Sequence, residues 1–363
     1  MGDETRKTDQ SGSGAWPVVM SWVGRTSALI GLFVTLTGGV TWLISHHRRT
    51  AERNAKMALA QAQTRQGEYQ AAVDTYSAVL KTEPLFSPAL DQQLETAMGW
   101  VEDFHVVGRE GQDAASAAGP RIDTILSILD AGLTRSTGTR AADIQAHIGW
   151  THWLNQHIAE REFGDAAAQN LRAALAADPS NVYANAMSGN LLLQKNGDFN
   201  EAIKRLDVAV SSGKARPFVR RLQIGGLLSN EEPGAPAELV KVANDMRKSG
   251  EALDEGYGTR ISNFCFAVGV SDHNALRKVL SAAPPDEIWS TYLWLSNGAR
   301  RSGEDAVAQQ FIQANLMEVS GKREQALEQF STLQKELKNS PGSLKDAVDA
   351  SVSRLSVGGS ASR

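Results

Sequence analysis

The sequence contains very little cysteine: Cys265 is the single thiol among 363 residues. One thiol cannot form a disulfide within the chain, and it excludes metal sites that are built from several thiolates. Because Cys265 lies inside an apolar stretch at 264–268, we expect it to be buried and unreactive. The count leaves the cellular compartment open, since many exported proteins also lack disulfides.

Common catalytic and nucleotide-binding motifs are missing as well. The sequence has no Gly-x-x-x-x-Gly-Lys phosphate loop, no dinucleotide fingerprint and no Gly-x-Ser-x-Gly elbow. Its formal net charge is only −4, so it lacks the basic excess that favours nucleic acid. We therefore expect no enzyme activity, no catalytic residues, no cofactor and no nucleic-acid partner.

Histidines are the one set of side chains that raises the question of a metal site. His147, His152 and His157 recur every five residues in a stretch with helical spacing. Five residues turn a helix by about 500°, so the three rings point in different directions. His157 and Glu160 have a spacing that suits a metal, but two ligands do not make a site. We expect no bound metal and interpret these histidines as surface or groove residues.

One long apolar run lies near the N-terminus. Residues 1–15 are polar and rich in Gly and Ser, which predicts a disordered tail. Residues 16–48 have the pattern of a membrane anchor whose core, 26–45, is twenty residues without a charge. A helix of that length crosses a hydrocarbon layer of about 30 Å. Arginines flank the core at both ends, Trp16 and Trp22 precede it and Trp42 lies near its other end, as is typical of the membrane interface.

Two other interpretations of this run are open. A cleavable signal peptide would have a shorter apolar core followed by small residues, whereas a basic cluster at 46–49 follows here. A buried helix of a soluble domain would not usually carry arginines at both ends. We therefore favour an uncleaved, single-pass membrane helix. Because no Gly or Pro occurs between Val40 and Gln66, we expect this helix to continue into the next one.

A stripe of small residues marks one side of the anchor. Ser27, Gly31, Thr35 and Gly39 recur every four residues, which allows close approach by a second membrane helix. One hypothesis is homo-oligomerisation through this stripe. The other is that Gly and Thr are simply common in membrane helices.

The rest of the chain has helical spacing with a repeated pattern of small and large residues. Ala167 and Ala202 are 35 residues apart, as are Ala174 and Ala209. Together with the run ALAADPSNVYANAMSGNLL at 174–192, this pattern resembles the tetratricopeptide repeat, a pair of antiparallel helices with a period of 34. One residue is therefore inserted, and the turn at Asn196–Gly197 is the expected place.

The resemblance defines four clear repeats, at 53–86, 148–181, 182–215 and 307–340. The first and last are carried by residues of the same pattern, namely Gly67, Tyr69, Ala72, Tyr76 and Pro84, and Ala314, Gly321, Ala326, Leu327, Phe330 and Leu333. Pro341 comes later than a closing proline should. Small residues are expected where helices approach closely and large ones between neighbouring hairpins. A single hairpin cannot bury its apolar face, so the hairpins must stack.

The predicted fold class is thus all-α: a right-handed helical-repeat solenoid of antiparallel helix pairs over 51–356, preceded by one transmembrane helix. A disordered tail is expected at 357–363 and a Gly-, Ala- and Ser-rich loop at 108–120. Further helices are expected at 87–102, 121–133, 217–228, 236–248, 260–281 and 286–297.

Members of the resembled family hold a peptide or helix in a groove lined by the first helix of each hairpin. The resemblance implies six groove candidates, His152, Gln156, Glu160, Ala186, Asn190 and Gln194. A separate basic patch, Arg216, Arg220 and Arg221, would either contact an acidic partner or form a solvated helix start. The leading hypothesis is a membrane-anchored scaffold that binds protein partners. Alternatives are a structural subunit of a bacterial envelope or secretion assembly, and an enzyme with an unfamiliar helical active site.

The charges that flank the anchor predict its orientation. Arg48, Arg49, Arg53 and Lys56 follow the run, against three basic residues before it, which favours a cytoplasmic C-terminal domain by one charge. A topology reporter fused after Arg363 should therefore report the cytoplasmic side. A reporter that is active only on the exported side would contradict this orientation.

Overall fold

A computed structural model of the chain describes residues 16–104, 111–159, 165–253, 255–296, 304–340 and 342–357. Within these ranges the side chains of 16–38, 111–117, 255, 268–269 and 304–305 are outside the description. The expected disordered segments at 1–15 and 357–363, except Val357 at the end of the last helix, also fall outside it, as does Pro341.

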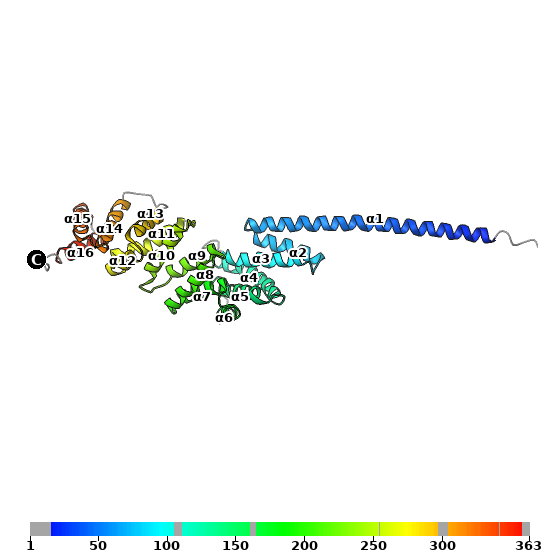
Figure 1. Ribbon diagram of the computed structural model, residues 1–363, viewed down its shortest axis with the longest axis horizontal. Coiled ribbons are helices and arrows are strands. Elements are labelled where there is room, and N and C mark those ends of the chain that lie inside the picture. Colours follow the sequence, from blue (N-terminus) through cyan, green and yellow to red (C-terminus); the bar gives the residue numbers. More distant parts are fainter. Residues whose placement is uncertain are drawn as a thin grey trace, which may run out of the picture. The chain divides into compact units, whose positions relative to one another are not determined.

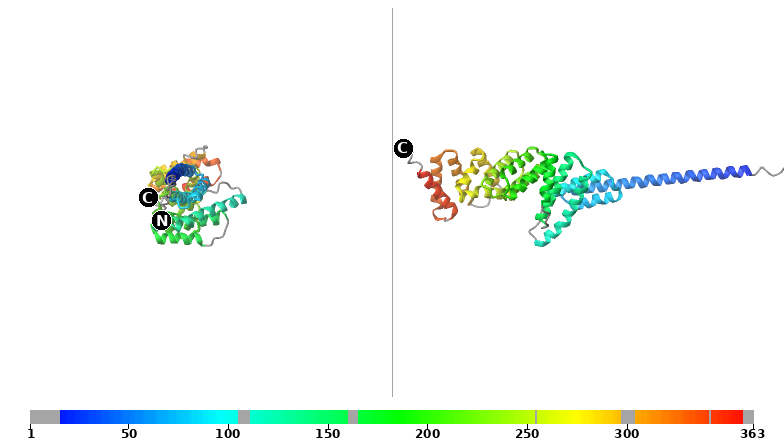
Figure 2. Two further views of the ribbon diagram at one scale, coloured as in Figure 1. Left: turned by 90° about the vertical axis from the view of Figure 1, so that its right-hand side faces the viewer. Right: turned by 90° about the horizontal axis from the view of Figure 1, so that it is seen from below.

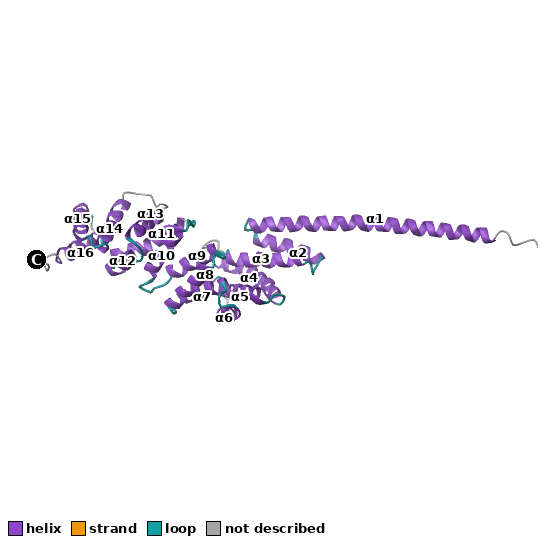
Figure 3. Cartoon of the chain, in the orientation of Figure 1, coloured by secondary structure: helices purple, strands orange, loops and turns teal. Residues whose placement is uncertain are grey.

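Throughout the described ranges the chain is helical with connecting loops and no strand, which confirms the all-α prediction (Figure 3). The helices are α1 Trp16–Arg65, α2 Tyr69–Thr82, α3 Ser87–Glu102, α4 Gly111–Leu133, α5 Gly138–His157, α6 Ala166–Ala177, α7 Val182–Gln194, α8 Phe199–Ser211, α9 Arg216–Leu228, α10 Ala235–Lys248, α11 Glu255–Phe266, α12 His273–Leu280, α13 Pro285–Ser296, α14 Glu304–Val319, α15 Arg323–Glu336 and α16 Ser343–Val357. Two short 3₁₀ helices, η1 Ala267–Val270 and η2 Leu337–Asn339, complete the set.

The chain divides into two compact units, Met1–Trp100 and Val101–Arg363. The first contains α1, α2 and most of α3. In the second, helices that follow one another pack as pairs, and α7 also packs against both α5 and α9. Such contacts between successive hairpins are those of a helical-repeat stack.

Helix α1 is one continuous helix of 50 residues (Figures 1 and 2). It runs through the apolar segment and on to Arg65, which confirms the expected continuity across Val40–Gln66. Within the described part of the chain, no helix is both long enough and apolar enough to cross a membrane. Of the predicted core at 26–45, the side chains of 26–38 lie outside the described residues.

The first predicted repeat is present as the hairpin of α1 and α2. Ala60 and Ala72, one on each helix, are fully buried, and Tyr76 is 1% exposed. Gly67 takes a left-handed φ of 77° in the turn, a conformation that costs glycine little. Helix α3 packs on this pair, since the Tyr76 hydroxyl donates to Gln92 Oε1 at 3.0 Å.

The hairpin of α7 and α8 shows why a small residue is needed at the predicted position. A Cβ on Gly189 would lie 2.8 Å from Leu206 Cγ and 3.0 Å from the Ala202 carbonyl oxygen. The two helices therefore meet nearly backbone to backbone. Ala202 is fully buried at this contact, as predicted, whereas Leu206, which was expected between neighbouring hairpins, is fully buried against Gly189 within the hairpin.

The inserted residue lies in the α7–α8 turn, as predicted. The turns after α1 and α14 each have one left-handed glycine, Gly67 and Gly321, and the next residue already caps the following helix. After α7 the left-handed residue is Asn196, with φ 48°, and Gly197 separates it from the cap, Asp198. The hydrogen bonding is the same as in the other two turns, because the residue after the left-handed one donates back across the turn: Gly197 N–H donates to Leu192 O at 2.8 Å.

The last predicted repeat forms the hairpin of α14 and α15. Ala314, Ala326, Phe330 and Leu333 are all fully buried in it. Cys265 is also fully buried, and desolvation raises the pKa of its thiol well above the usual range. This environment agrees with the prediction of an unreactive thiol.

Three predicted boundaries are wrong. The loop expected at 108–120 is helical from 111 onward, and α4 carries Pro120 in its interior. The helix expected at 260–281 is divided by η1 and a turn into α11 and α12. The hairpin expected to begin at 148 begins with α5 at Gly138. Helix α5 is long, and a long connection, 158–165, follows it.

The Gly189 contact predicts a large effect of a single methyl group. Gly189→Ala should destabilise the full chain by about 1–3 kcal/mol, because the added Cβ meets backbone as well as side chain. Gly225→Ala, also in a helix but with nothing within 4 Å of its Cβ, should be neutral or stabilise by up to about 1 kcal/mol. Urea unfolding followed by circular dichroism compares them, and equal effects would contradict the packing argument.

Candidate partner-binding face

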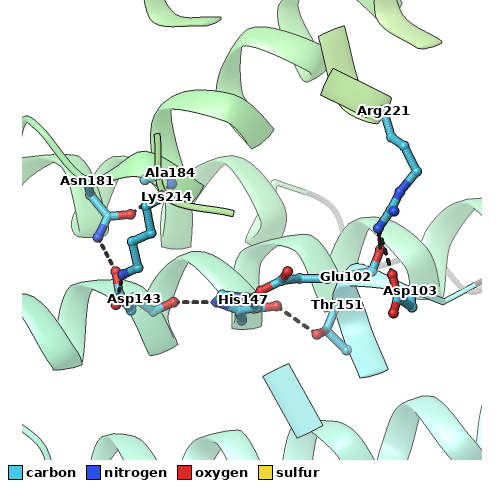
Figure 4. A network of polar contacts seen from close by, with 9 residues as sticks. All are labelled: Glu102, Asp103, Asp143, His147, Thr151, Asn181, Ala184, Lys214 and Arg221. Atoms are coloured by element: carbon cyan, nitrogen blue, oxygen red, sulfur yellow. Dashed lines mark hydrogen bonds and ion pairs between the residues drawn. The ribbon is translucent and has the colours of Figure 1, made fainter. Parts of the chain in front are cut away.

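The first helices of successive hairpins, α5, α7 and α9, pack side by side and form one continuous surface. We call it the α5–α7–α9 face. It carries a network of polar contacts that joins the end of α3, α5, the start of α7 and α9 (Figure 4).

His147 is the buried centre of this network. Its Nδ1 lies 2.7 Å from the Asp143 carbonyl oxygen, which can only accept, so Nδ1 carries a proton. Its Nε2 lies 3.2 Å from Glu102 Oε1.

Asp143, also on α5, connects this helix to the start of α7 and to the α8–α9 connection. Its carboxylate accepts from Lys214 Nζ and from Asn181 Nδ2, both at 2.7 Å. The Asn181 side chain also accepts from Ala184 N at 2.9 Å and so caps α7. One carboxylate thereby fixes the N-terminus of α7 and the α8–α9 connection relative to α5.

Aromatic rings fill the space beside these polar groups. The Tyr183 ring meets His147 edge to face with centroids 4.4 Å apart, and Lys214 Nζ lies 4.7 Å from the Tyr183 centroid. Phe218 of α9 lies next along, 6.4 Å from Tyr183. The His147 side chain is fully buried and that of Asp143 is 13% exposed, whereas the Lys214 side chain is 50% exposed, so the network runs from the interior to the surface.

The predicted basic patch is paired with carboxylates of this chain. Arg220, with a side chain only 5% exposed, donates to Glu251 and Asp245 and, at 2.9 Å, to Gln223 Oε1. Arg216 Nε donates to Glu251 Oε1 at 2.8 Å. The interpretation as a solvated helix start is therefore wrong for Arg220, which is itself buried and pairs with the mostly buried Glu251 and the half-exposed Asp245.

Arg221 belongs to the polar network of the face. It donates to the Glu102 carbonyl oxygen at 3.1 Å and to Asp103 Oδ1 at 2.7 Å. Its guanidinium also lies 5.9 Å from the centroid of Phe218. About a third of its side chain, 34%, is exposed, as is 36% of that of Arg216.

A cavity of about 580 Å³ lies beside these arginines. Its lining combines charged groups with the apolar and aromatic side chains of Ile224, Met246, Leu253 and Tyr257. The charged groups are Arg216, Arg220, Arg221 and Glu251. This mixed lining suits a ligand that has an apolar part next to a polar or acidic one.

The six groove candidates lie in different environments. Ala186 is fully buried, and Asn190, 2% exposed, donates to the Leu222 carbonyl oxygen of α9 at 2.7 Å. Neither can line an open groove, which corrects the prediction for both. Gln194 and His152 are partly buried, Gln156 is exposed, and Glu160 lies outside the described residues. Desolvation lowers the pKa of His152, and the nearby charge of Asp130 partly offsets that shift.

The α5 candidates were assigned in the wrong register. A Cβ on Gly149 would lie 3.0 Å from both Ala167 O and Leu171 Cγ, the same kind of contact that Gly189 makes with α8. Gly149 and Gly189 are 40 residues apart, whereas Ala167 and Ala202 are 35 apart. The wide α5–α6 connection accounts for the difference. In α5 the counterparts of Ala186, Asn190 and Gln194 are Ala146, Trp150 and Leu154, all buried.

The small-residue stripe of the anchor falls mostly outside the description. The side chains of Ser27, Thr35 and their neighbours, and the surroundings of Gly31, are not described, although α1 is helical there. Gly39 is exposed, with nothing within 4 Å of a Cβ built on it. The proposal of helix association through this stripe remains a prediction.

Among the described residues, no group of three His, Cys, Asp or Glu side chains is arranged to hold a metal ion. His147, interpreted from the sequence as a surface or groove residue, is instead buried at the centre of this network. The contacts of Asp143, Asn181 and Lys214 were not predicted from the sequence. The spacing of Asp143, His147 and Thr151, four residues each, was the available signal, because it places them on one side of a helix.

Comparison with known proteins adds no relative: no model of a known protein family matches the chain, and no curated protein matches it.

The arginine pairs predict unequal effects of two substitutions in one patch. Arg220→Ala should destabilise the chain by about 2–3 kcal/mol, because it removes the buried partner of Glu251 and a bond to Gln223. Arg216→Ala, which removes a more exposed partner of the same carboxylate, should cost about 1 kcal/mol or less. Thermal unfolding measures both, and equal losses would show that Arg220 is not structural.

Proposed function

We propose that the chain is a single-pass membrane protein whose helical-repeat solenoid, right-handed and of tetratricopeptide type, binds a protein partner. The observation that carries the proposal is the continuity of α1. The uncharged run at 26–45 and the first helix of the first hairpin belong to one unbroken helix. A helix of this kind holds the hairpin that follows rigidly beside a membrane and not on a flexible tether.

The repeated hairpin contacts support membership of the resembled family. Gly149 and Gly189 occupy the same kind of close approach between paired helices, and Ala60 and Ala314 are fully buried in two further hairpins. Stacks of such hairpins present extended surfaces, and binding other proteins is their usual use. This assignment rests on the pattern and its packing, and so does the expected absence of catalysis.

The cavity beside α9 is the best candidate for the partner site. The cavity is lined by Arg216 and Arg221, whose side chains are 36% and 34% exposed. Leu253 and Tyr257 provide apolar surface next to these guanidinium groups. A partner segment with an apolar side chain followed by an acidic one has the matching chemistry.

Photo-cross-linking in intact cells tests this site. A photoreactive amino acid at Tyr257 should give a defined cross-linked product, because its side chain lines the cavity. The same amino acid at Val208, which is 38% exposed on α8, is the matched control and should give none. Arg221→Ala should weaken the Tyr257 product, since one of the two partly exposed cations is lost.

Absence of any product at Tyr257, or an equal product at Val208, would contradict the cavity as partner site.

Purification in detergent separates the two protein-binding roles. Varied, substoichiometric partners support a recruiting scaffold, whereas one stable stoichiometric complex would support a structural subunit of an envelope or secretion assembly. Phe33→Arg places a charge in the uncharged run and should change the share of the protein that is found in the soluble fraction of a cell lysate. An unchanged share would count against the membrane anchor.

A further inference from the structure

One leucine is exposed to an unusual degree at the turn between α2 and α3. Leu85 is 90% exposed, more than any of the other large hydrophobic side chains that are exposed in the described part of the chain. Four of those others, Val40, Trp42, Leu43 and Ile44, lie in the apolar run itself. Exposed apolar side chains thus gather at one end of the first unit.

The turn lies beside a defined position along the axis of α1. Helix α2 runs back along α1, so the turn faces the N-terminal part of α1 (Figure 1). Arg53 joins the two, since its Nη1 lies 3.0 Å from Glu83 Oε2 and its guanidinium 4.4 Å from the Phe86 centroid. These contacts place the turn, 83–86, level with Arg53 on α1.

This position along α1 is close to the surface of the membrane that the uncharged run is proposed to span. Arg53 follows Ser45, the end of the uncharged run, by eight residues, or about 12 Å of helix. The headgroup layer occupies roughly the first 5–7 Å beyond the hydrocarbon. Side chains of a helix lean towards its N-terminus, and a tilt of about 20° is ordinary for membrane helices. The lean of the side chains and the tilt of the helix both bring the turn to the headgroups.

The backbone of the turn does not require leucine. The turn between α6 and α7 has the same geometry: Asn181 N–H donates to Asp178 O at 3.0 Å, as Phe86 N–H donates to Glu83 O at 3.1 Å. Each turn has proline at its second position, Pro84 and Pro179. At the third position the later turn has an exposed serine, Ser180, where this one has Leu85.

Charge near the turn also suits a lipid surface. Arg48, Arg49, Lys56 and Lys81 are exposed around it, and Arg48 pairs only with Glu52, itself exposed, across one helical turn. An apolar side chain beside several basic ones is the usual composition of a contact with anionic headgroups.

We infer that Leu85 enters the headgroup layer of the membrane that holds α1 and gives the first hairpin a second contact with lipid. The inference rests on the proposed membrane anchoring. With two contacts, the rotation of the hairpin about α1 is fixed, so that one side of it always faces the membrane.

Fluorescence quenching in lipid nanodiscs tests the contact. The full chain is reconstituted in phosphatidylcholine with some phosphatidylserine and a lipid that carries a nitroxide on its headgroup. Bimane is attached at Leu85→Cys, at Leu43→Cys in the apolar run, or at Gln66→Cys, exposed at the opposite end of the same hairpin. Cys265 is fully buried, so labelling is selective.

The nitroxide lipid should quench the labels at positions 43 and 85 several-fold more than the label at 66, and aqueous iodide should show the reverse order. If position 85 behaves like 66 while 43 is quenched by lipid, the Leu85 contact is wrong and the anchor stands. If 43 is not quenched by lipid, the anchor fails, and the Leu85 contact fails with it.

A second measurement keeps the leucine in place. A label at Ser87→Cys, exposed two residues further along, should be quenched by the nitroxide lipid in the presence of Leu85. Adding Leu85→Ser, the residue type of the equivalent turn, should lower that quenching several-fold. Adding Leu59→Ser, at a leucine that is 53% exposed on α1, should leave it unchanged. Equal quenching in all three would overturn the inference.

Discussion

The packing of this protein depends on places where two helices meet with almost no side chain between them. At Gly189 the α7 backbone lies against the Ala202 carbonyl of α8, and at Gly149 the α5 backbone lies against the Ala167 carbonyl of α6. Leu171 and Leu206, both almost fully buried, pack directly against these glycines, which have no side chain in their way. The same contact fixes the register within each pair.

The contacts between pairs are of another kind. Along α5, α7 and α9 they include a buried polar network in which Asp143 and His147 hold the helix starts and the α8–α9 connection. Such groups are costly to bury unless every partner is in place, so they favour one arrangement of the hairpins over nearby ones. Arg221 of this network also lines the cavity beside α9.

Helix α1 extends the rigidity of the hairpins beyond the stack. From Arg53 onward it is packed against α2 and its turn, and the side chains between 39 and 52 are mostly exposed. An unbroken helix transmits orientation along its length, whereas a glycine- or proline-containing linker would not. If the uncharged run spans a membrane, as proposed, the orientation of the first hairpin follows from α1 and from whatever its turn at 83–86 contacts.

The sequence by itself determined the helical class, the unbroken α1, the small and large residues of the hairpins and the inserted residue at Asn196–Gly197. These depend on local periodicity and on the volume of single side chains, which a sequence displays directly. Only the tertiary structure decided the register of α5 and the burial of Asn190 and Arg220. The register depends on the length of a connection, and burial depends on which helix lies opposite, so neither is encoded in the spacing of residues along one helix.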